Sequence, residues 1–170
     1  MIATLDLPAE LTTPVGPVTL RRARPGDLDA VMALLADDPV SASRGDRARD
    51  ADRPQYAAAL AGILADPSND LLVAVTDDDA PVATMQLTLI PGMARRGASR
   101  LQVEAVRVAS ARRSGGIGGA LMQWVIGPAV EATGAGLVQL TSDAARADAH
   151  RFYERLGFAA SHVGFKYRVG

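Results

Sequence analysis

The chain has 170 residues, of which 48% are hydrophobic and 22% charged. This balance is typical of one globular domain with a real hydrophobic core, and it excludes a disordered or fibrous protein. The 18 basic and 19 acidic residues leave a net charge of −1, so no positive field favours DNA or RNA as a partner. Because the chain contains no cysteine, disulfides, thiolate metal sites and cysteine nucleophiles are excluded.

The first 17 residues show no sorting signal. They lack the basic start and continuous apolar core of a signal peptide, and no run in the chain approaches the ~20 apolar residues that span a bilayer. We therefore expect a cytoplasmic protein without a membrane partner. Pro8, Pro14 and Pro17 predict an extended N-terminal extension over 1–17, followed by a single domain over 18–170.

Alternating and helical periodicities predict a regular series of elements up to residue 90. They are a strand at 18–24, a helix at 27–37, a solvated loop at 38–54, a helix at 54–65, a buried strand at 70–75, a turn at 77–79 and a strand at 81–90. Asp46, Asp50 and Asp52 in the loop are candidates to attract a cationic amine, although a solvated loop is the simpler interpretation. The basic loop at 91–100 is expected to be a solvated hairpin tip.

The stretch from 101 to 126 is the most informative part of the chain. Leu101 and Val103 alternate on one face of a strand, and Val106 and Val108 continue the alternation one position out of step. A one-residue bulge near 104–106 would produce this shift and would leave backbone groups unpaired. A glycine-rich turn and a helix with an apolar face follow the strand.

The turn, Arg113 to Gly119 (RSGGIGG), has the chemistry of an anion site. Free N–H groups and the positive end of the dipole at a helix N-terminus favour an anion, most often phosphate, and Arg113 would add a donor pair. The P-loop does not fit because its Gly-Lys-Ser/Thr end is missing, and the dinucleotide fingerprint finds Leu121 at its third glycine. The alternative is a tight strand-to-helix turn without a ligand.

A second candidate stretch, residues 148–158 (DAHRFYERLGF), reads as a helix with Phe152, Tyr153 and Leu156 on its apolar face and Gly157 as its stop. A tyrosine in such a position is, taken alone, more often part of the core than a catalyst.

Strands are also expected at 137–141 and at 159–169. The second of these would be the last hairpin partner, with Phe165, Tyr167 and Val169 on one face. The two histidines, at positions 150 and 162, are isolated and lack the spacing of metal ligands. We therefore predict no metal site.

Together the two candidate stretches resemble the GNAT superfamily of N-acetyltransferases. Residues 113–118 match the family's R/Q-x-x-G-x-G/A motif at the end of a strand, and residues 149–158 match its A-x-x-x-Y-x-x-x-G-F signature. The resemblance covers about 18–169. It implies a mixed α/β fold with a central, mostly antiparallel sheet of six to seven strands, flanked by about four helices and splayed between the strands at 101–108 and 137–141.

The resemblance also implies acetyl-coenzyme A as the donor co-substrate. In the family, the strand before the turn pairs with the pantetheine arm, and the turn amides hold the pyrophosphate. Carried over to this chain, the pantetheine residues are Val106, Arg107 and Val108, and the pyrophosphate residues are Arg113, Ser114, Gly115, Gly116, Ile117, Gly118 and Gly119. Many members have an asparagine three positions before the signature alanine, where this chain has Arg146.

The resemblance makes Tyr153 the general acid that protonates the departing coenzyme A thiolate. An alkylammonium is not nucleophilic until it loses a proton, so a carboxylate or a water chain should stand near the acceptor. Glu104 is the candidate base, a role that some family members give to a glutamate here; the alternative is that it only orders the bulge or points to solvent. A backbone N–H near Val106 or Arg107 is the candidate to stabilise the oxyanion.

The sequence therefore predicts an acyltransferase that moves acetyl from acetyl-coenzyme A to a primary amine by direct attack in a ternary complex. One alternative is a non-catalytic acyl-coenzyme A binding or sensing domain. Another is a nucleotide-phosphate binder, which would prefer ATP or NAD to coenzyme A. The acceptor, a small-molecule or a protein amine, depends on the loops and is not identified. The oligomeric state stays open, with a homodimer as one option because many relatives form dimers.

Overall fold

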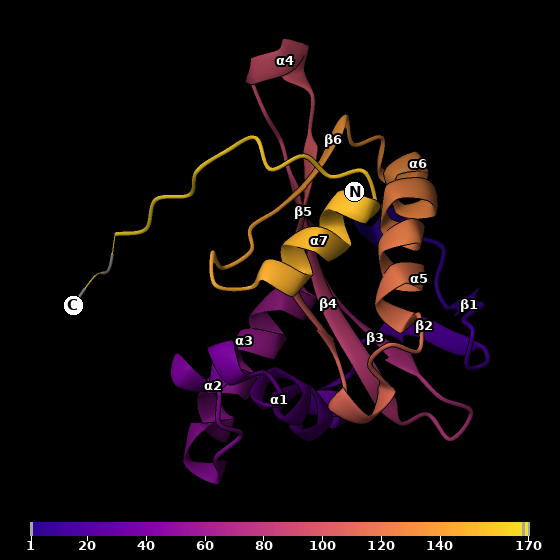
Figure 1. Cartoon of the computed structure of the whole chain (residues 1–170), viewed down its shortest axis with the longest axis vertical. Coiled ribbons are helices and arrows are strands. Elements are labelled where there is room, and N and C mark those ends of the chain that lie inside the picture. The colour runs from indigo at the N-terminus through magenta and orange to yellow at the C-terminus, as the bar shows by residue number, and fades with distance from the viewer. Residues whose placement is uncertain (1, 168, 170) are drawn as a thin grey trace.

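Six strands form one curved sheet in the order in which they occur along the chain (Figure 1). The computed structural model describes residues 2–167 and 169. The strands are β1 (Ala9–Leu11), β2 (Val18–Arg22), β3 (Asn69–Val75), β4 (Pro81–Ile90), β5 (Arg100–Val108) and β6 (Leu137–Leu140). Neighbouring strands from β1 to β5 run antiparallel, and β6 runs parallel to β5. The predicted mixed α/β fold with a mostly antiparallel sheet is confirmed.

Helices connect and cover the strands. They are α1 (Leu28–Ala36), α2 (Pro39–Ser43), α3 (Arg53–Ala65), α4 (Ala94–Gly97), α5 (Ile117–Trp124), α6 (Val130–Thr133) and α7 (Ala147–Arg155). Short 3-10 turns occur at Ile2–Thr4, Pro25–Asp27, Asp50–Asp52 and Ser110–Arg112. A π-helical segment, Val125–Ala129, joins α5 to α6 and contains Pro128. The wider π turn accommodates a residue that has no N–H to donate.

The sheet separates two apolar cores. On one face, Leu72 and Ala74 of β3 belong to the larger core, which includes residues of α5. On the other face, Leu71, Val73 and Val75 pack with residues of α1 and α3. Figure 1 shows the corresponding helices on opposite sides of the strands. Because alternate side chains of a strand point to opposite faces, β3 needs an uninterrupted apolar sequence to serve both cores.

The N-terminal segment packs against the rest of the fold. β1 pairs with β2 at the sheet edge, and Ile2 and Leu11 are buried in the larger core. The chain then crosses the N-terminus of α5, where a Cβ atom on Gly116 would lie 2.4 Å from Cδ of Pro14. A side chain at position 116 is therefore disfavoured by contact as well as by the backbone angle φ of +83°.

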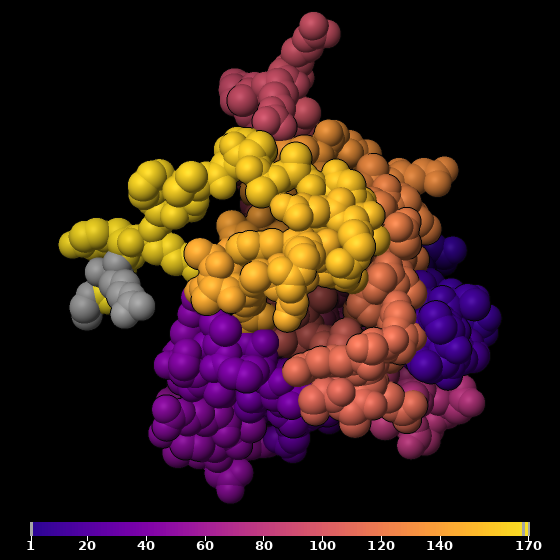
Figure 2. Space-filling model, viewed as in Figure 1, coloured from indigo at the N-terminus to yellow at the C-terminus, as the bar shows by residue number. Residues whose placement is uncertain are grey.

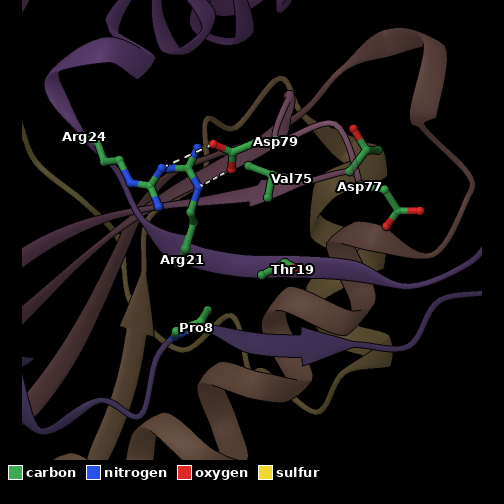
Figure 3. Close-up of a pocket in the computed structure, with 8 residues that line it drawn as sticks. Pro8, Thr19, Arg21, Arg24, Val75, Asp77 and Asp79 are labelled. Atoms are coloured by element: carbon green, nitrogen blue, oxygen red, sulfur yellow. Dashed lines mark hydrogen bonds and ion pairs between the residues drawn. The ribbon is translucent and has the colours of Figure 1, made fainter.

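A buried ion pair fixes the sheet to the start of α1. Arg21 donates to both carboxylate oxygens of Asp27 at 2.8 and 2.9 Å, and its Nε donates to Asp79 at 2.7 Å. Figure 3 shows Arg21 and Asp79 at the side of an open pocket of about 420 Å³. None of the residues predicted to act in catalysis lines this pocket. We regard the Arg21 network as structural, since it joins β2, the start of α1 and the β3–β4 turn.

The prediction of a solvated loop at 38–54 was wrong in part, because α2 and a 3-10 turn lie within it. Asp38 caps α2 by accepting a hydrogen bond of 2.8 Å from the amide of Ser41, and Pro39 occupies the first helical position. An Asp-Pro pair at these positions is a recognised start signal for a helix.

The predicted last strand at 159–169 is also wrong. In its described part, residues 159–167 and 169, the chain forms no strand, and Phe165 and Tyr167 are both 92% exposed. Position 168 lies outside the described residues. Figure 1 shows this segment leading away from the body of the protein after α7. Alternation alone predicted a strand, but a strand also needs a hydrogen-bonded partner, and this segment does not pair with β6.

We predict that Asp27→Asn lowers the free energy of unfolding by about 3 kcal/mol at pH 7, because it leaves the buried Arg21 charge short of its main partner. The hydrogen bonds from Arg21 hold the pKa of Asp27 below its usual value. Its contribution is therefore present at neutral pH and is lost as the pH falls through that lowered pKa. Urea denaturation at pH 7 and pH 3 should show the difference between the two proteins shrinking in acid. Asp77→Asn, on the β3–β4 turn that also carries Asp79, is the control, and equal midpoints of wild type and Asp27→Asn at pH 7 would contradict the role of the pair.

Two glycines of the turn should respond oppositely to alanine. Gly116→Ala should cost about 1 to 3 kcal/mol, because it combines a positive φ with the contact to Pro14. Gly119→Ala should stabilise the protein by about 0.5 to 1 kcal/mol, since its Cβ would enter open space within a helix. Thermal and urea unfolding measure both changes. A neutral Gly116→Ala would show that the N-terminal segment does not hold this contact in solution.

Candidate active site

The site forms where β5 and β6 part. The two strands pair only from Arg100 opposite Leu137 to Val103 opposite Leu140, whereas β5 continues to Val108. Residues 104–108 of β5 therefore have no strand partner on the β6 side within the described part of the chain. The parting of these strands, which the sequence analysis expected, is confirmed. It leaves a backbone edge free for an extended ligand.

A β-bulge lies at the beginning of the free edge. In the β4–β5 ladder, Met85 alone stands opposite two residues of β5, because Thr84 pairs with Arg107 and Gln86 pairs with Glu104. Ala105 within the bulge has a φ of +51°. The one-residue bulge predicted from the broken alternation is confirmed.

The bulge decides which side chains face which core. Val106 and Val108 pack against the larger core on the α5 side. Arg107 points the other way and donates to Oγ of Ser41 in α2 at 2.5 Å. By the alternation along the strand, Glu104 lies on the same face as Arg107, and it is exposed. The strand thus presents an apolar pair to one side and a charged pair to the other.

The turn between β5 and α5 is built as predicted. Ser114 and Gly116 both have positive φ angles, of 63° and 83°, and Gly116 is the N-cap of α5. An open pocket of about 250 Å³ lies beside the turn and is lined by residues 111–115 and Val15. The first amides of α5 are not used within the helix, so the turn presents donors of the kind that bind anions.

Arg113 is held by the protein itself. Its Nε donates to the carbonyl oxygen of Val108 at 3.1 Å, and one Nη donates to the carbonyl oxygen of Asp37. The Asp37 carboxylate in turn accepts the amide of Ser110 at 2.5 Å, and this bond lowers its pKa. The Arg113 side chain thus anchors the turn to the end of α1, in addition to the predicted role of its guanidinium toward an anion.

Tyr153 lies in α7, which ends in a Schellman motif. The amides of Gly157 and Phe158 donate to the carbonyl oxygens of Glu154 and Tyr153, and Gly157 has a φ of +90°. The predicted glycine stop is confirmed. The Tyr153 ring makes edge contacts with Phe152 and Phe158 at centroid distances of 5.1 and 5.8 Å, so α7 both packs and orients this side chain.

The Tyr153 hydroxyl has no hydrogen-bond partner in the described part of the chain, although much of the ring is buried. Burial raises the pKa of Tyr153, while the nearby charges of Arg107 and Arg146 act in the opposite direction. The hydroxyl is therefore protonated at neutral pH and free to donate. The charges of both arginines therefore reach this hydroxyl.

Two ion pairs connect α2 with the loop before α7. Arg146 pairs with Asp38, and Arg44 pairs with Asp143. The sequence analysis noted Arg146 only as a departure from asparagine, and it missed Asp38, Asp143 and Ser41. These contacts join residues about 100 positions apart in the chain, so no local pattern predicts them. Figure 2 shows a recess where α7, the α1–α2 segment and the β5–α5 turn meet.

The acidic candidates for amine binding and the basic loop at 91–100 lie in different parts of the protein. Asp46 accepts a hydrogen bond of 2.5 Å from the hydroxyl of Tyr56, which raises the Tyr56 pKa to about 12. Asp52 pairs with Arg49, and Asp50 is exposed. The basic loop at 91–100 projects from the end of the sheet opposite the glycine turn, as expected of a solvated tip (Figure 1).

Other kinds of site find little support. The ring of His150 contacts the carbonyl oxygen of Asp143 at 2.9 Å, and that of His162 contacts Ser161 at 2.8 Å. Within residues 2–167 and 169, no three His, Cys, Asp or Glu side chains are arranged to hold a metal ion. No helix of that described part is long and apolar enough to cross a membrane.

Solved structures share this arrangement. A transcriptional regulator from Bacillus halodurans C-125 is 39% identical, with a TM-score of 0.84, over 89% of this chain and 99% of that one. A provisionally assigned acetyltransferase from Agrobacterium tumefaciens is 29% identical, with a TM-score of 0.72, over 88% and 99% of the two chains. Glucosamine-6-phosphate N-acetyltransferase from Arabidopsis thaliana has the same fold, with 16% identity and a TM-score of 0.70 over 90% and 99%.

Among curated proteins, none matches this chain by sequence. The family model described as "Acetyltransferase (GNAT) family" matches residues 28–158, which include the bulged strand, the glycine turn and Tyr153. The chain belongs to the GNAT family of acetyltransferases.

Proposed function

We propose that this protein is an N-acetyltransferase that moves an acetyl group from acetyl-coenzyme A to a primary amine. The parting of β5 from β6 is the observation that carries the proposal, because it joins a free strand edge to the glycine turn at one end and to Tyr153 at its side. Acetyltransferase family membership supports the reaction class.

The residues at the opening fit a coenzyme A thioester. Two buried side-chain atoms in the described part of the chain lack a hydrogen-bond partner, Nε of Arg107 and Oγ of Ser142. Arg107 is on β5, and Ser142 follows the end of β6, so both residues belong to the strand ends that part, and their orphaned atoms are buried there. Unpaired buried polar groups are costly and are usually explained by a missing partner. Gly119, at the start of α5, has open space where a Cβ would stand, which leaves room for a phosphate near the helix amides.

Acetyl-coenzyme A would supply an activated acetyl thioester. The free edge of β5, residues 106–108, would hold its pantetheine arm by backbone hydrogen bonds, and the amides of residues 114–119 would hold its pyrophosphate. Because Arg113 is anchored to Val108 and Asp37, we assign the larger share of the phosphate contacts to the backbone amides.

Tyr153 would act as the general acid toward the leaving sulfur. Its raised pKa keeps the phenol protonated at neutral pH, and the packing of its ring against Phe152 and Phe158 fixes the direction of the hydroxyl. A positioned acid of this kind is worth about 10²- to 10⁴-fold in rate.

Glu104 would act as the base that removes a proton from the acceptor ammonium, directly or through water. It is exposed on the face of β5 that also carries Arg107, at the edge of the bulge. In the balanced reaction, a C–N bond forms and the C–S bond breaks, the acceptor nitrogen loses a proton and the sulfur gains one. No covalent intermediate with the protein is required, which agrees with the absence of cysteine.

A non-catalytic acyl-coenzyme A sensing domain is the second candidate. It is supported by the relative with 39% identity, which is named as a transcriptional regulator. Such a domain would bind the coenzyme without turnover, so its affinity would not distinguish it from an enzyme. The free Tyr153 hydroxyl favours catalysis, because a sensing domain has no use for an unpaired donor at this place.

Tyr153→Phe should lower kcat by about 10²- to 10⁴-fold, because it removes only the proton donor. Release of free coenzyme A thiol, measured with a panel of primary amines, follows the rate. The thermal shift with coenzyme A should stay within error of the wild-type value, since the ring packing is kept.

Tyr167→Phe is the matched control, because Tyr167 is 92% exposed in the C-terminal segment. Unchanged turnover in Tyr153→Phe would remove Tyr153 from the mechanism. Coenzyme binding with no turnover on any amine would favour the sensing domain.

Glu104→Gln should lower the rate of acetyl transfer chiefly at neutral pH. Part of the rate should return at high pH, where the free amine no longer needs a base.

A further inference from the structure

Arg107 has no ion-pair partner in the described part of the chain, although the charges of Asp38 and Asp46 act on it from a distance. One Nη donates to the carbonyl oxygen of Val106 at 2.8 Å and another donates to Oγ of Ser41 at 2.5 Å. Both acceptors are uncharged, and no carboxylate in the described part of the chain lies within ion-pairing distance. The side chain is half-buried, so water compensates its charge only in part.

Two neighbouring arginines, unlike Arg107, form ion pairs within the protein. Arg146 and Arg44 each have an aspartate partner, Asp38 and Asp143 respectively. The acidic groups closest to Arg107 are therefore already engaged, since Asp38 bonds to Arg146 and Asp46 accepts the hydroxyl of Tyr56. Of Arg44, Arg107 and Arg146, Arg107 is the one without a directly bonded carboxylate in the described part of the chain.

The position of Arg107 links this charge to the reaction. It follows the bulge on the free part of β5, and it acts electrostatically on Tyr153. Its Nε is one of the two orphaned polar atoms at the opening. A half-buried cation without an ion-pair partner costs free energy in the unliganded protein, and an anionic ligand at its Nη groups would recover part of that cost.

We propose that Arg107 binds a carboxylate of the acceptor, and hence that the acceptor is a small amine that carries a carboxylate, of the amino-acid type. This assignment rests on the proposed acetyltransferase function and names the substrate class of that site. A guanidinium and a carboxylate have opposite charges, and the paired donors of the first fit the paired acceptors of the second.

The other end of such an acceptor would face Glu104. Glu104 and Arg107 lie on one face of β5 with the bulge between them, so their Cα atoms are about 7 to 10 Å apart along the strand. Flexible side chains of this length can converge on one small zwitterion. A single guanidinium can neutralise a monoanion but not a phosphate dianion, and the charges of Asp38 and Asp46, which reach Arg107, would repel the dianion more strongly than a carboxylate.

The test is titration calorimetry of matched acceptors, with and without coenzyme A, so that the readout does not depend on turnover. The acceptors are β-alanine and β-alaninamide, 4-aminobutyrate and its amide, and O-phosphoethanolamine as the phosphate arm. Wild-type protein should bind each carboxylate about 10- to 100-fold more tightly than its amide. Thiol release with acetyl-coenzyme A should show the same preference in kcat/KM.

Arg107→Gln should abolish this preference by weakening only the carboxylates, and Arg107→Lys should restore part of it, because lysine keeps the charge but not the fork. Arg155→Gln, an exposed arginine of α7, is the control and should keep the wild-type preference. The thermal shift with coenzyme A should keep its wild-type value in Arg155→Gln, and measuring it in the two Arg107 variants separates any change in donor binding from the change in acceptor preference.

Equal binding of acid and amide by the wild-type protein would overturn the proposal, as would an equal loss of both in Arg107→Gln. Tighter binding of O-phosphoethanolamine than of β-alanine would overturn the choice of carboxylate. If coenzyme A gives no heat and no turnover occurs, the proposed function fails. The preference for carboxylate over amide, measured without coenzyme A, still decides the role of Arg107.

Discussion

The bulge in β5 is the constraint on which the candidate site depends. One extra residue between Glu104 and Arg107 shifts the alternation of the strand, so that Val106 and Val108 pack on the α5 side while Arg107 faces α2. Without the bulge, the strand beyond it would present the opposite faces, with an arginine in the larger core. The same strand loses its β6 partner just before the bulge. The free edge, the Arg107 side chain and the approach to Tyr153 therefore lie together along one short segment of β5.

Two distant parts of the chain hold the opening in place. The N-terminal segment lies on the glycine turn through Pro14, so the small residues of this turn serve the protein's own packing as well as any ligand. On the other side, the ion pairs of Arg146 with Asp38 and of Arg44 with Asp143 tie α2 to the loop before α7. Asp37 fixes the β5–α5 turn to α1. The catalytic candidates thus sit on elements whose relative positions are set by polar contacts between segments far apart in sequence.

The sequence predicted the fold, the bulge, the glycine turn and the end of α7, because each of these features produces a recognisable pattern among neighbouring residues. A broken alternation indicates a bulge, and a glycine after an apolar helix indicates its stop. The α2 helix was missed although Asp38 and Pro39 are a start signal for it, since the charged surroundings suggested a loop. The strand expected at 159–169 failed because alternation does not ensure a partner. The sequence could not predict which arginines of the site form ion pairs. This depends on the three-dimensional contact that lets Asp38 bond to Arg146 and leaves Arg107 without such a partner.

The most direct test of the central claim is a thermal-shift titration of the protein with acetyl-coenzyme A, coenzyme A, ATP and NAD in parallel. A ligand that binds only the folded state stabilises it, by about 2.7 kcal/mol at a concentration 100-fold above its Kd. We expect stabilisation by the two coenzyme A ligands and none by ATP or NAD. A shift with the nucleotides alone would assign the glycine turn to a different phosphate ligand. No shift with coenzyme A at saturating concentration would mean that residues 113–119 form only a turn, and it would contradict the acetyl-coenzyme A dependence proposed for this chain.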